Sequence, residues 1–200
     1  MESGLHFRYG TVSSAKSMAL LSVAHSYTLQ GKKVLCGKPG VDDRDGADMI
    51  ASKCGFERKA DVVIGRTSDG SKEFSKFDLS TYHVVLIDES QFLLPEAIDY
   101  LQHLSHKFSK PVLCYGLRSD CRTNLFPGSQ RLMEIASTLE EIVSICWYCT
   151  KKALFNLRLV DGKPTTEGPS IALGGLESYL PVCARCYKQK LDNESVPRLC

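Results

Sequence analysis

The stretch from Leu5 to Ser17 reads Leu-His-Phe-Arg-Tyr-Gly-Thr-Val-Ser-Ser-Ala-Lys-Ser, and it decides how the chain is expected to fold. Its order predicts a strand, a tight loop and the start of a helix. Successive backbone N–H groups in such a loop, the positive end of the helix and a lysine together favour binding of an anion. The stretch therefore predicts a phosphate-binding loop within an α/β fold.

Residues 10 to 17 follow the phosphate-loop template GxxxxGK[ST] at Gly10, Lys16 and Ser17 and depart from it at Ala15. Ala15 still carries a backbone N–H, but its Cβ restricts φ and lies near the path of a phosphate oxygen. The loop alone leaves two interpretations open, because an ordinary strand-to-helix turn with a lysine in its first helical turn looks the same. The rest of the chain has to distinguish between them.

The composition is that of one globular domain with room for a small appendage: 200 residues, 43% hydrophobic and 24% charged. A formal net charge of +2 without a sustained basic stripe argues against binding polymeric nucleic acid. No run approaches the roughly 18 apolar residues of a membrane span, and the first residues lack an export signal, so we expect a cytoplasmic protein. Nine cysteines, an odd number, then favour thiols or metal ligands over disulfides.

Strand and helix patterns alternate along the first part of the chain. Helical spacing predicts a helix from Lys16 to Gln30, another that begins at Pro95, and a third from Gln130 to Glu141. Such alternation favours an α/β fold, with a parallel sheet, helices on both faces and ligands at the carboxyl ends of the strands. The strands expected from short apolar runs are Lys33–Cys36, Asp61–Ile64, Val84–Glu89 and Val112–Tyr115.

Asp88 and Glu89 end the third of these strands. In a phosphate-binding α/β fold, an acid at this place holds Mg²⁺, usually through water, and a neighbouring carboxylate can take a proton from an attacking hydroxyl. Adjacent residues of a strand point to opposite sides, so we expect the two acids to have different roles. A solvated strand end is the alternative, and the loop at Lys16 and Ser17 weighs against it.

Two Cys-x-x-Cys pairs stand later in the chain, Cys146 with Cys149 and Cys183 with Cys186. Each pair can place two thiolates on one turn, and two such turns form a closed tetrahedral site that suits structural Zn²⁺. Cysteines that fill core space and a redox pair are the alternatives. The spacing of the pairs leaves room for a hairpin or lasso that the metal would fasten at both ends.

These patterns divide the chain into a P-loop α/β domain over residues 1–143, a small zinc-binding domain over 144–190 and a loose tail over 191–200. Within the zinc-binding domain, alternating apolar residues predict strands at Leu154–Leu159 and Ile171–Leu173. A turn is expected between them at Asp161 and Gly162.

Taken in order, these motifs resemble the type II (cytosolic) thymidine kinases, and the bacterial branch of that family is the most similar. The resemblance extends from about Leu5 to Lys190 and rests on the phosphate loop, the acidic strand end, the segments after it and the cysteine pairs. Besides the loop, the matching motifs are Asp88-Glu89-x-Gln91-Phe92, Tyr115-Gly116-Leu117-Arg118, Phe126-x-Gly128-Ser129 and Gly174-Gly175-x-x-x-Tyr179-x-x-x-Cys183.

The resemblance implies transfer of the γ-phosphoryl group of ATP to the 5′-hydroxyl of thymidine, with Mg²⁺ bound beside ATP and a structural Zn²⁺. It implies that Glu89 is the catalytic base, that Ser17 and Asp88 hold Mg²⁺, and that the protein forms a homo-oligomer, a tetramer in the family. The implied ATP-binding residues are Gly10, Thr11, Val12, Ser13, Ser14, Ala15, Lys16, Ser17, Asp42, Asp43, Arg44, Asp88, Glu89, Ser90 and Gln91. The implied nucleoside-binding residues are Cys121, Ser170, Ile171, Ala172, Leu173, Gly174 and Tyr179.

Two residues depart from the family pattern. Ala15 replaces the second glycine of the loop, and Cys121 stands where the family usually has phenylalanine before Arg122. Cysteine offers less area than phenylalanine and no π face to a thymine ring, so weaker thymidine binding or an altered base preference is expected. Two rival functions stay open. One is a nucleotide-binding or regulatory homologue with weakened catalysis, and the other is a zinc module for nucleic acid or protein, which scattered charges disfavour.

Overall fold

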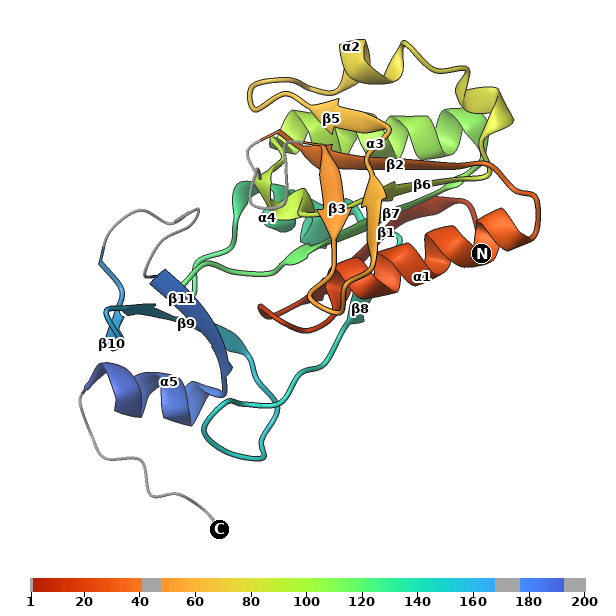
Figure 1. Ribbon diagram of the computed structural model, residues 1–200. Coiled ribbons are helices and arrows are strands. Elements are labelled where there is room, and N and C mark those ends of the chain that lie inside the picture. Colours follow the sequence, from red (N-terminus) through yellow and green to blue (C-terminus); the bar gives the residue numbers. More distant parts are fainter. Residues whose placement is uncertain (1, 41–47, 168–176, 193–200) are drawn as a thin grey trace.

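The computed structural model describes residues 2–40, 48–167 and 177–192. Its largest element is a six-stranded sheet in the order β5-β2-β6-β7-β1-β8, in which every neighbouring pair is parallel (Figure 1). The sheet confirms the α/β class expected from the alternation of strand and helix patterns. Its strands are β1 Gly4–Gly10, β2 Val34–Pro39, β5 Val62–Ile64, β6 Val84–Ile87, β7 Pro111–Leu117 and β8 Thr138–Glu141.

Helices cover both faces of this sheet and form two apolar layers with it. One face carries α1 (Lys16–Leu29), and the other carries α3 (Pro95–Phe108), α4 (Pro127–Ile135) and the short α2 (Ser71–Phe74). Because successive strand residues point to opposite faces, the central strands contribute side chains to both layers. Burial on both faces is typical of parallel sheets and makes the strand ends a rigid base for a site.

The carboxyl ends of the parallel strands lie at one edge of the sheet. The register pairs Gly10, the last residue of β1, with Leu117, the last residue of β7. The N–H of Asp88, just past β6, donates to the carbonyl oxygen of Gly37 in β2 at 2.9 Å. The phosphate loop and the acidic residues therefore leave the sheet at the same edge, where ligands bind in such folds.

The helix expected from Gln130 to Glu141 is wrong in its second half. α4 ends at Ile135, and Ala136 is already extended, with ψ of 138°. Thr138–Glu141 forms β8, which pairs in parallel with His6–Tyr9 of β1. The backbone groups along this side of β1 need hydrogen-bond partners, and the segment after α4 supplies them, a long-range requirement that overrides local helical spacing.

A second, three-stranded antiparallel sheet in the order β10-β9-β11 has an apolar cluster of its own. Its elements are β9 Phe155–Val160, β10 Lys163–Thr165, β11 Glu177–Val182 and the following helix α5 Ala184–Leu191. This sheet with α5 and the two cysteine pairs is called the small domain below, and the parallel sheet with its helices the large domain. The turn expected at Asp161 and Gly162 is confirmed, with φ of 48° and 75°, the left-handed pair of a two-residue hairpin. The strand expected at Ile171–Leu173 lies outside the described residues.

The remaining described elements are short. β3 (Met49–Ala51) and β4 (Glu57–Lys59) form an antiparallel hairpin that packs against α1 through the buried Ile50. The 3₁₀ turns η1 (Leu79–Thr81) and η2 (Ser90–Phe92) come before and after β6. Among the residues that the model describes, no helix combines the length and the apolar character needed to cross a membrane.

Candidate active site

The phosphate loop connects β1 to α1 at the carboxyl edge of the sheet (Figure 1). Two of its residues have left-handed backbone conformations, Ser13 with φ of 59° and Ala15 with φ of 63°. Such residues curl the backbone so that successive N–H groups point to one concave side, which is how backbone nests bind anions. The loop residues Gly10 to Ser17 thus have a conformation suited to phosphate.

Ala15 occupies the position where the template has glycine and adopts the left-handed conformation that glycine takes without strain. For a residue with a Cβ, this conformation costs about 1 kcal/mol. The carbonyl oxygen of Ala15 still accepts the first helical bond, from the N–H of Ala19 at 2.9 Å. The alanine therefore costs stability, but α1 begins in the normal way directly after it.

Lys16 is buried at the start of α1, with 7% of its surface exposed. Its Nζ donates to the carbonyl oxygen of Thr11 at 2.6 Å and to the hydroxyl of Ser14 at 3.4 Å. The side chain thus folds back over the loop, and its ammonium group lies among the loop's own atoms. This is the place where a positive charge acts on a phosphate held by the loop.

Asp88 lies across from the loop and is buried to 4% exposure. Burial, together with the charge of Glu89, raises the pKa of Asp88 to about 7, while the nearby Ser17 hydroxyl and the charge of Lys16 oppose that shift. Oδ1 of Asp88 is buried and has no hydrogen-bond partner in the described part of the chain. A buried carboxylate oxygen beside a serine hydroxyl is a donor set that suits Mg²⁺.

The backbone at Glu89 differs from the strand conformation expected for the two acids. β6 ends at Ile87, and Glu89 has left-handed backbone angles, with φ of 48° and ψ of 35°. The two carboxylates are therefore separated by a turn and not by the alternation of a strand. Glu89 is half-buried, and one of its carboxylate oxygens accepts a hydrogen bond from Nε2 of Gln91.

Ser90 and Gln91, both expected to bind ATP, have buried side chains that contact the protein itself. The Ser90 hydroxyl donates to the carbonyl oxygen of Tyr115 at 3.0 Å, and Oε1 of Gln91 accepts from the N–H of Leu117 at 2.9 Å. Both contacts join the turn after β6 to the end of β7. These two side chains hold in place the turn from Asp88 to Gln91, which is called the acidic turn below.

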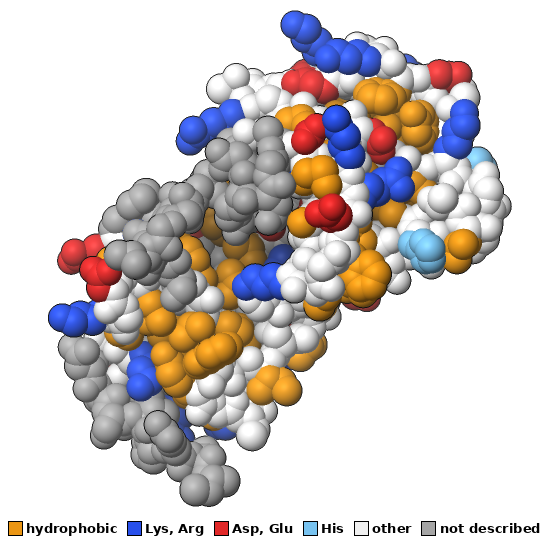
Figure 2. All heavy atoms as spheres, viewed as in Figure 1, with side chains coloured by type: hydrophobic (Ala, Val, Ile, Leu, Met, Phe, Trp, Pro, Cys, Tyr) orange, Lys and Arg blue, Asp and Glu red, His pale blue; other side chains and the backbone are white. Residues whose placement is uncertain are grey.

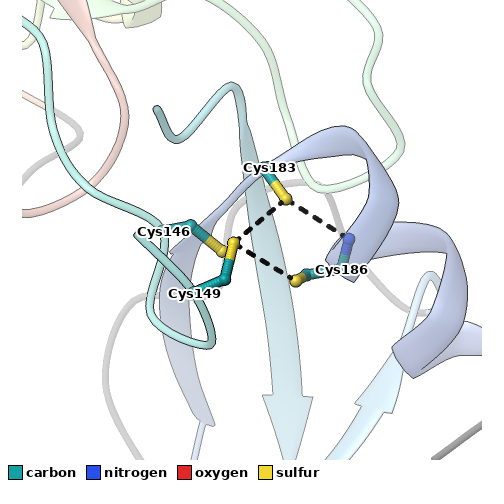
Figure 3. A group of neighbouring side chains, drawn as sticks. All are labelled: Cys146, Cys149, Cys183 and Cys186. Atoms are coloured by element: carbon teal, nitrogen blue, oxygen red, sulfur yellow. Dashed lines mark hydrogen bonds between the residues drawn. The ribbon is translucent and has the colours of Figure 1, made fainter. Parts of the chain in front are cut away.

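The four cysteines of the two pairs meet at one point of the small domain (Figure 3). Cys146 and Cys149 lie on a loop, Cys183 precedes α5, and Cys186 lies in its first turn. The sulfur of Cys149 is 3.7 Å from that of Cys183 and 3.8 Å from that of Cys186. Thiolates about 2.3 Å from a tetrahedral Zn²⁺ lie about 3.8 Å apart, so the geometry fits zinc.

Backbone N–H groups favour the thiolate form at two of the four cysteines, Cys146 and Cys183, whereas burial and hydrogen bonds to the neighbouring sulfurs raise the pKa of Cys186. Burial would raise the pKa of Cys146, but backbone N–H groups of Cys183, Tyr148 and Cys149 lower it to about 7. The N–H of Cys186 likewise points to the sulfur of Cys183, at 3.5 Å. Donors aimed at sulfur stabilise the thiolate form, which is the form that binds metal.

Residues expected to bind the nucleoside are only partly described. Cys121 is buried in a turn where Oδ1 of Asp120 accepts from the N–H groups of Arg122 and Asn124, each at 2.9 Å. Its carbonyl oxygen accepts a hydrogen bond from the Tyr187 hydroxyl on α5. Tyr179 lies on β11 of the small domain. Asp42, Asp43, Arg44, Ser170, Ile171, Ala172, Leu173 and Gly174 lie outside the described residues.

Similarity to known proteins shows the family to which the chain belongs. A family model described as thymidine kinase matches residues 3–187 of the chain. The chain belongs to the thymidine kinase family.

Bacterial members of the thymidine kinase family match nearly the whole chain. It is 40% identical over 188 residues to a thymidine kinase of Lactococcus lactis, a match that covers 92% of this chain and 96% of the relative. It is 41% identical over 183 residues to a thymidine kinase of Lactiplantibacillus plantarum, with 92% and 94% covered. A thymidine kinase of Streptococcus pyogenes serotype M3 is 40% identical over 183 residues, with 92% and 96% covered. The resemblance stated from the motifs is confirmed.

Asn156 joins the small domain to the phosphate loop of this thymidine kinase family member, and the sequence motifs did not predict this role. Asn156 on β9 is 4% exposed; its Oδ1 accepts from the N–H of Val12 in the phosphate loop at 2.8 Å. Its Nδ2 donates to the carbonyl oxygen of Ser119 at 3.0 Å. The alternation of polar and apolar residues along β9 could have indicated it. Asn156 and Arg158 are buried polar residues on the strand face opposite Leu157, as expected where another part of the protein covers that face.

Charged side chains of both signs lie on the surface of the molecule. On the face drawn in Figure 2, lysine and arginine side chains are interspersed with aspartate and glutamate and form no continuous basic stripe. A nucleotide needs only the local positive charge of the phosphate loop, whereas polymeric nucleic acid binds extended basic surfaces.

Proposed function

We propose that the chain is a thymidine kinase that transfers the γ-phosphoryl group of ATP to the 5′-hydroxyl of thymidine, with deoxyuridine as a further acceptor. The single observation that carries the proposal is the buried carboxylate of Asp88, whose Oδ1 has no hydrogen-bond partner in the described part of the chain, beside Ser17 and Lys16 of the phosphate loop. This arrangement brings the loop and the acidic turn to one place, as phosphoryl transfer requires. The names of the curated relatives support thymidine as the acceptor.

We assign the nucleotide site to the loop and the acidic turn. Gly10 to Ser17 would surround the phosphates through backbone N–H groups, with Lys16 as the positive charge. Ser17 and Asp88 would hold Mg²⁺, which supplies neutralising charge to the phosphate oxygens when bound. Asp42, Asp43 and Arg44 are assigned to the same nucleotide by family resemblance alone.

Glu89 is the base in this proposal. Its carboxylate takes the proton of the thymidine 5′-hydroxyl, whose oxygen forms a bond to the γ-phosphorus while the bond to the β–γ bridging oxygen breaks. ADP and thymidine 5′-phosphate result, and the proton rests on Glu89. Little covalent work falls to the protein, so the residues mainly position the reactants and offset charge.

The nucleoside half of the site is assigned to the small domain and the turn at Cys121. Tyr179 on β11 and the segment Ser170 to Gly174 would enclose the base and sugar, and a structural Zn²⁺ on the four cysteines would hold that segment's domain together. We propose the domain boundary near residue 144, between the last strand of the large sheet and the first cysteine. A tetrameric assembly and a cytoplasmic location are further proposals that follow from family resemblance.

A weakened, regulatory homologue was the rival that Ala15 kept open. We disfavour it because Ala15 adopts the left-handed conformation of the template's glycine, so the alanine does not displace the loop. Formation of thymidine 5′-phosphate from thymidine, ATP and Mg²⁺ tests the proposal directly. Glu89→Gln is expected to lower kcat about 10²- to 10⁴-fold while ATP still binds. Binding of ATP and thymidine without turnover by the unmodified protein would favour the rival.

A further inference from the structure

Gln91 makes two hydrogen bonds that join the proposed base to the end of β7. Its Nε2 donates to Oε2 of Glu89 at 2.5 Å, and its Oε1 accepts from the N–H of Leu117 at 2.9 Å. The orientation of the amide is fixed by chemistry, because a backbone N–H can only donate. Oε1 must face Leu117, and the NH₂ group must therefore face the carboxylate of Glu89.

Packing leaves this amide little freedom. Gln91 is 1% exposed, and a Cβ on Gly116 would lie 2.6 Å from its Oε1. A Cβ on Gly128 would lie 2.6 Å from the carbonyl oxygen of Ser90 and 3.1 Å from that of Gln91. The acidic turn is thus pressed against β7 and the start of α4, and only glycine fits at the two points of closest approach.

This burial argues against the contact with ATP that the sequence predicted for Gln91. A side chain with 1% exposure has almost no surface to offer a nucleotide. Its two polar ends are instead engaged by Glu89 and by the backbone at Leu117, which leads into the turn that carries Cys121. The same amide therefore touches both the proposed base and the chain segment on the nucleoside side.

We propose that Gln91 is the positioning residue of the reaction, which orients the Glu89 carboxylate and sets its distance from the acceptor hydroxyl. The proposal rests on the proposed function, in which Glu89 is the base. A carboxylate at the end of a flexible side chain gains most from such a contact, because small misplacements of a reacting group cost large factors in rate. The amide acts through Glu89 and touches no reacting atom.

Gln91→Glu is the sharpest variant, since it keeps the size of the side chain and the acceptor for Leu117. It replaces the donor that faces Glu89 by a carboxylate oxygen. We expect kcat to fall about 10- to 100-fold, with the KM for ATP within about twofold. The melting temperature should fall as well, because the variant buries a second carboxyl group beside the carboxylate of Glu89. Unchanged kcat in this variant would overturn the proposal.

A double variant separates positioning from general damage. If Gln91 acts through Glu89, adding Gln91→Glu to Glu89→Gln should lower kcat no further, because coupled residues are not additive. Additive losses would overturn the proposal. If Glu89→Gln alone leaves kcat unchanged, the assignment of the base fails first, and that outcome is distinct from failure of Gln91→Glu alone.

Ser129→Ala is the matched control for loosening the same place. The buried Ser129 hydroxyl donates to the carbonyl oxygen of Leu117 at 2.6 Å, and Leu117 is the same residue whose N–H donates to Gln91. We expect a lower melting temperature and a kcat within about threefold of the parent protein. A loss of kcat in Ser129→Ala as large as that in Gln91→Glu would assign both effects to β7 and overturn the specific role of Gln91.

Discussion

The regions around the two larger sheets are stabilised in different ways. The large domain rests on two apolar layers around a parallel sheet, with members from every helix and most strands. In the small domain, the fully buried apolar cluster consists of Cys146, Leu157, Val182, Cys183 and Cys186. Three of these five described residues are thiols of the proposed zinc site, so a bound metal would supply there what hydrocarbon supplies around the parallel sheet.

Removal of zinc should have the largest effect, because it should affect the small domain and leave the large domain folded. Cys183→Ser, or chelation at neutral pH, is expected to unfold the small domain, because structural zinc contributes about 10 kcal/mol or more in small zinc domains. Thymidine binding should be lost, while ATP binding to the large domain should change by less than about tenfold. Zinc content by elemental analysis, limited proteolysis and separate calorimetric titrations with ATP and thymidine measure these effects. Survival of thymidine binding in the metal-free protein would contradict the assignment.

A cavity in the large core should produce the next largest effect. Leu86 of β6 is fully buried against α1, and Leu86→Ala is expected to cost about 2–5 kcal/mol through lost burial and the cavity that remains. The variant should keep its zinc, since its defect lies in the other domain. Denaturant unfolding and zinc content together check this. Loss of zinc without loss of stability of the parallel sheet would contradict the expectation that a cavity in one domain leaves the other intact.

The link between the domains should be worth less than either core. Asn156→Ala removes the hydrogen bonds to Val12 and Ser119 and leaves two backbone groups without those partners. We expect a cost of about 1–3 kcal/mol and weaker binding of both substrates. Lys163→Ala, on an exposed position of the same small sheet, serves as the control and should change neither. If the Asn156 variant binds ATP and thymidine normally, the hydrogen bonds of Asn156 do not contribute to substrate binding.

The smallest effect is expected at Ala15. Ala15→Gly removes the strain of the left-handed backbone but increases the freedom of the unfolded chain, and the two effects differ by about 0.5 kcal/mol. We expect a slightly higher melting temperature and an unchanged or lower KM for ATP. A clear loss of stability would show that Ala15 is not strained, against its φ of 63°.

Local patterns predicted most of the large domain. The expected helix from Lys16 to Gln30 is found as Lys16–Leu29, and the helix begun by Pro95 starts at that residue. β8 was missed because its pairing with β1 depends on residues far away in sequence. The left-handed turn at Glu89 was missed for a related reason: the close approach of β7 and α4, and not the local sequence, bends the chain after β6.

The site shows the same division. Motif spacing predicted the cysteine cluster and the approach of the phosphate loop to Asp88, because few folds satisfy those spacings. The partners of Asn156 and the role of Gln91 did not follow from motif spacing, since each depends on an amide whose two ends contact different parts of the fold. Amide side chains carry no motif of their own, and only their partners define them.

The Tyr187 hydroxyl contacts the turn that carries Cys121 through the backbone oxygen of that residue and not through its side chain. An anchor of this kind is indifferent to which amino acid stands at position 121, so evolution can exchange that side chain without detaching the turn from α5. If Cys121 lines the nucleoside pocket as proposed, single substitutions at this position can change the acceptor preference while the attachment of the turn to α5 stays in place.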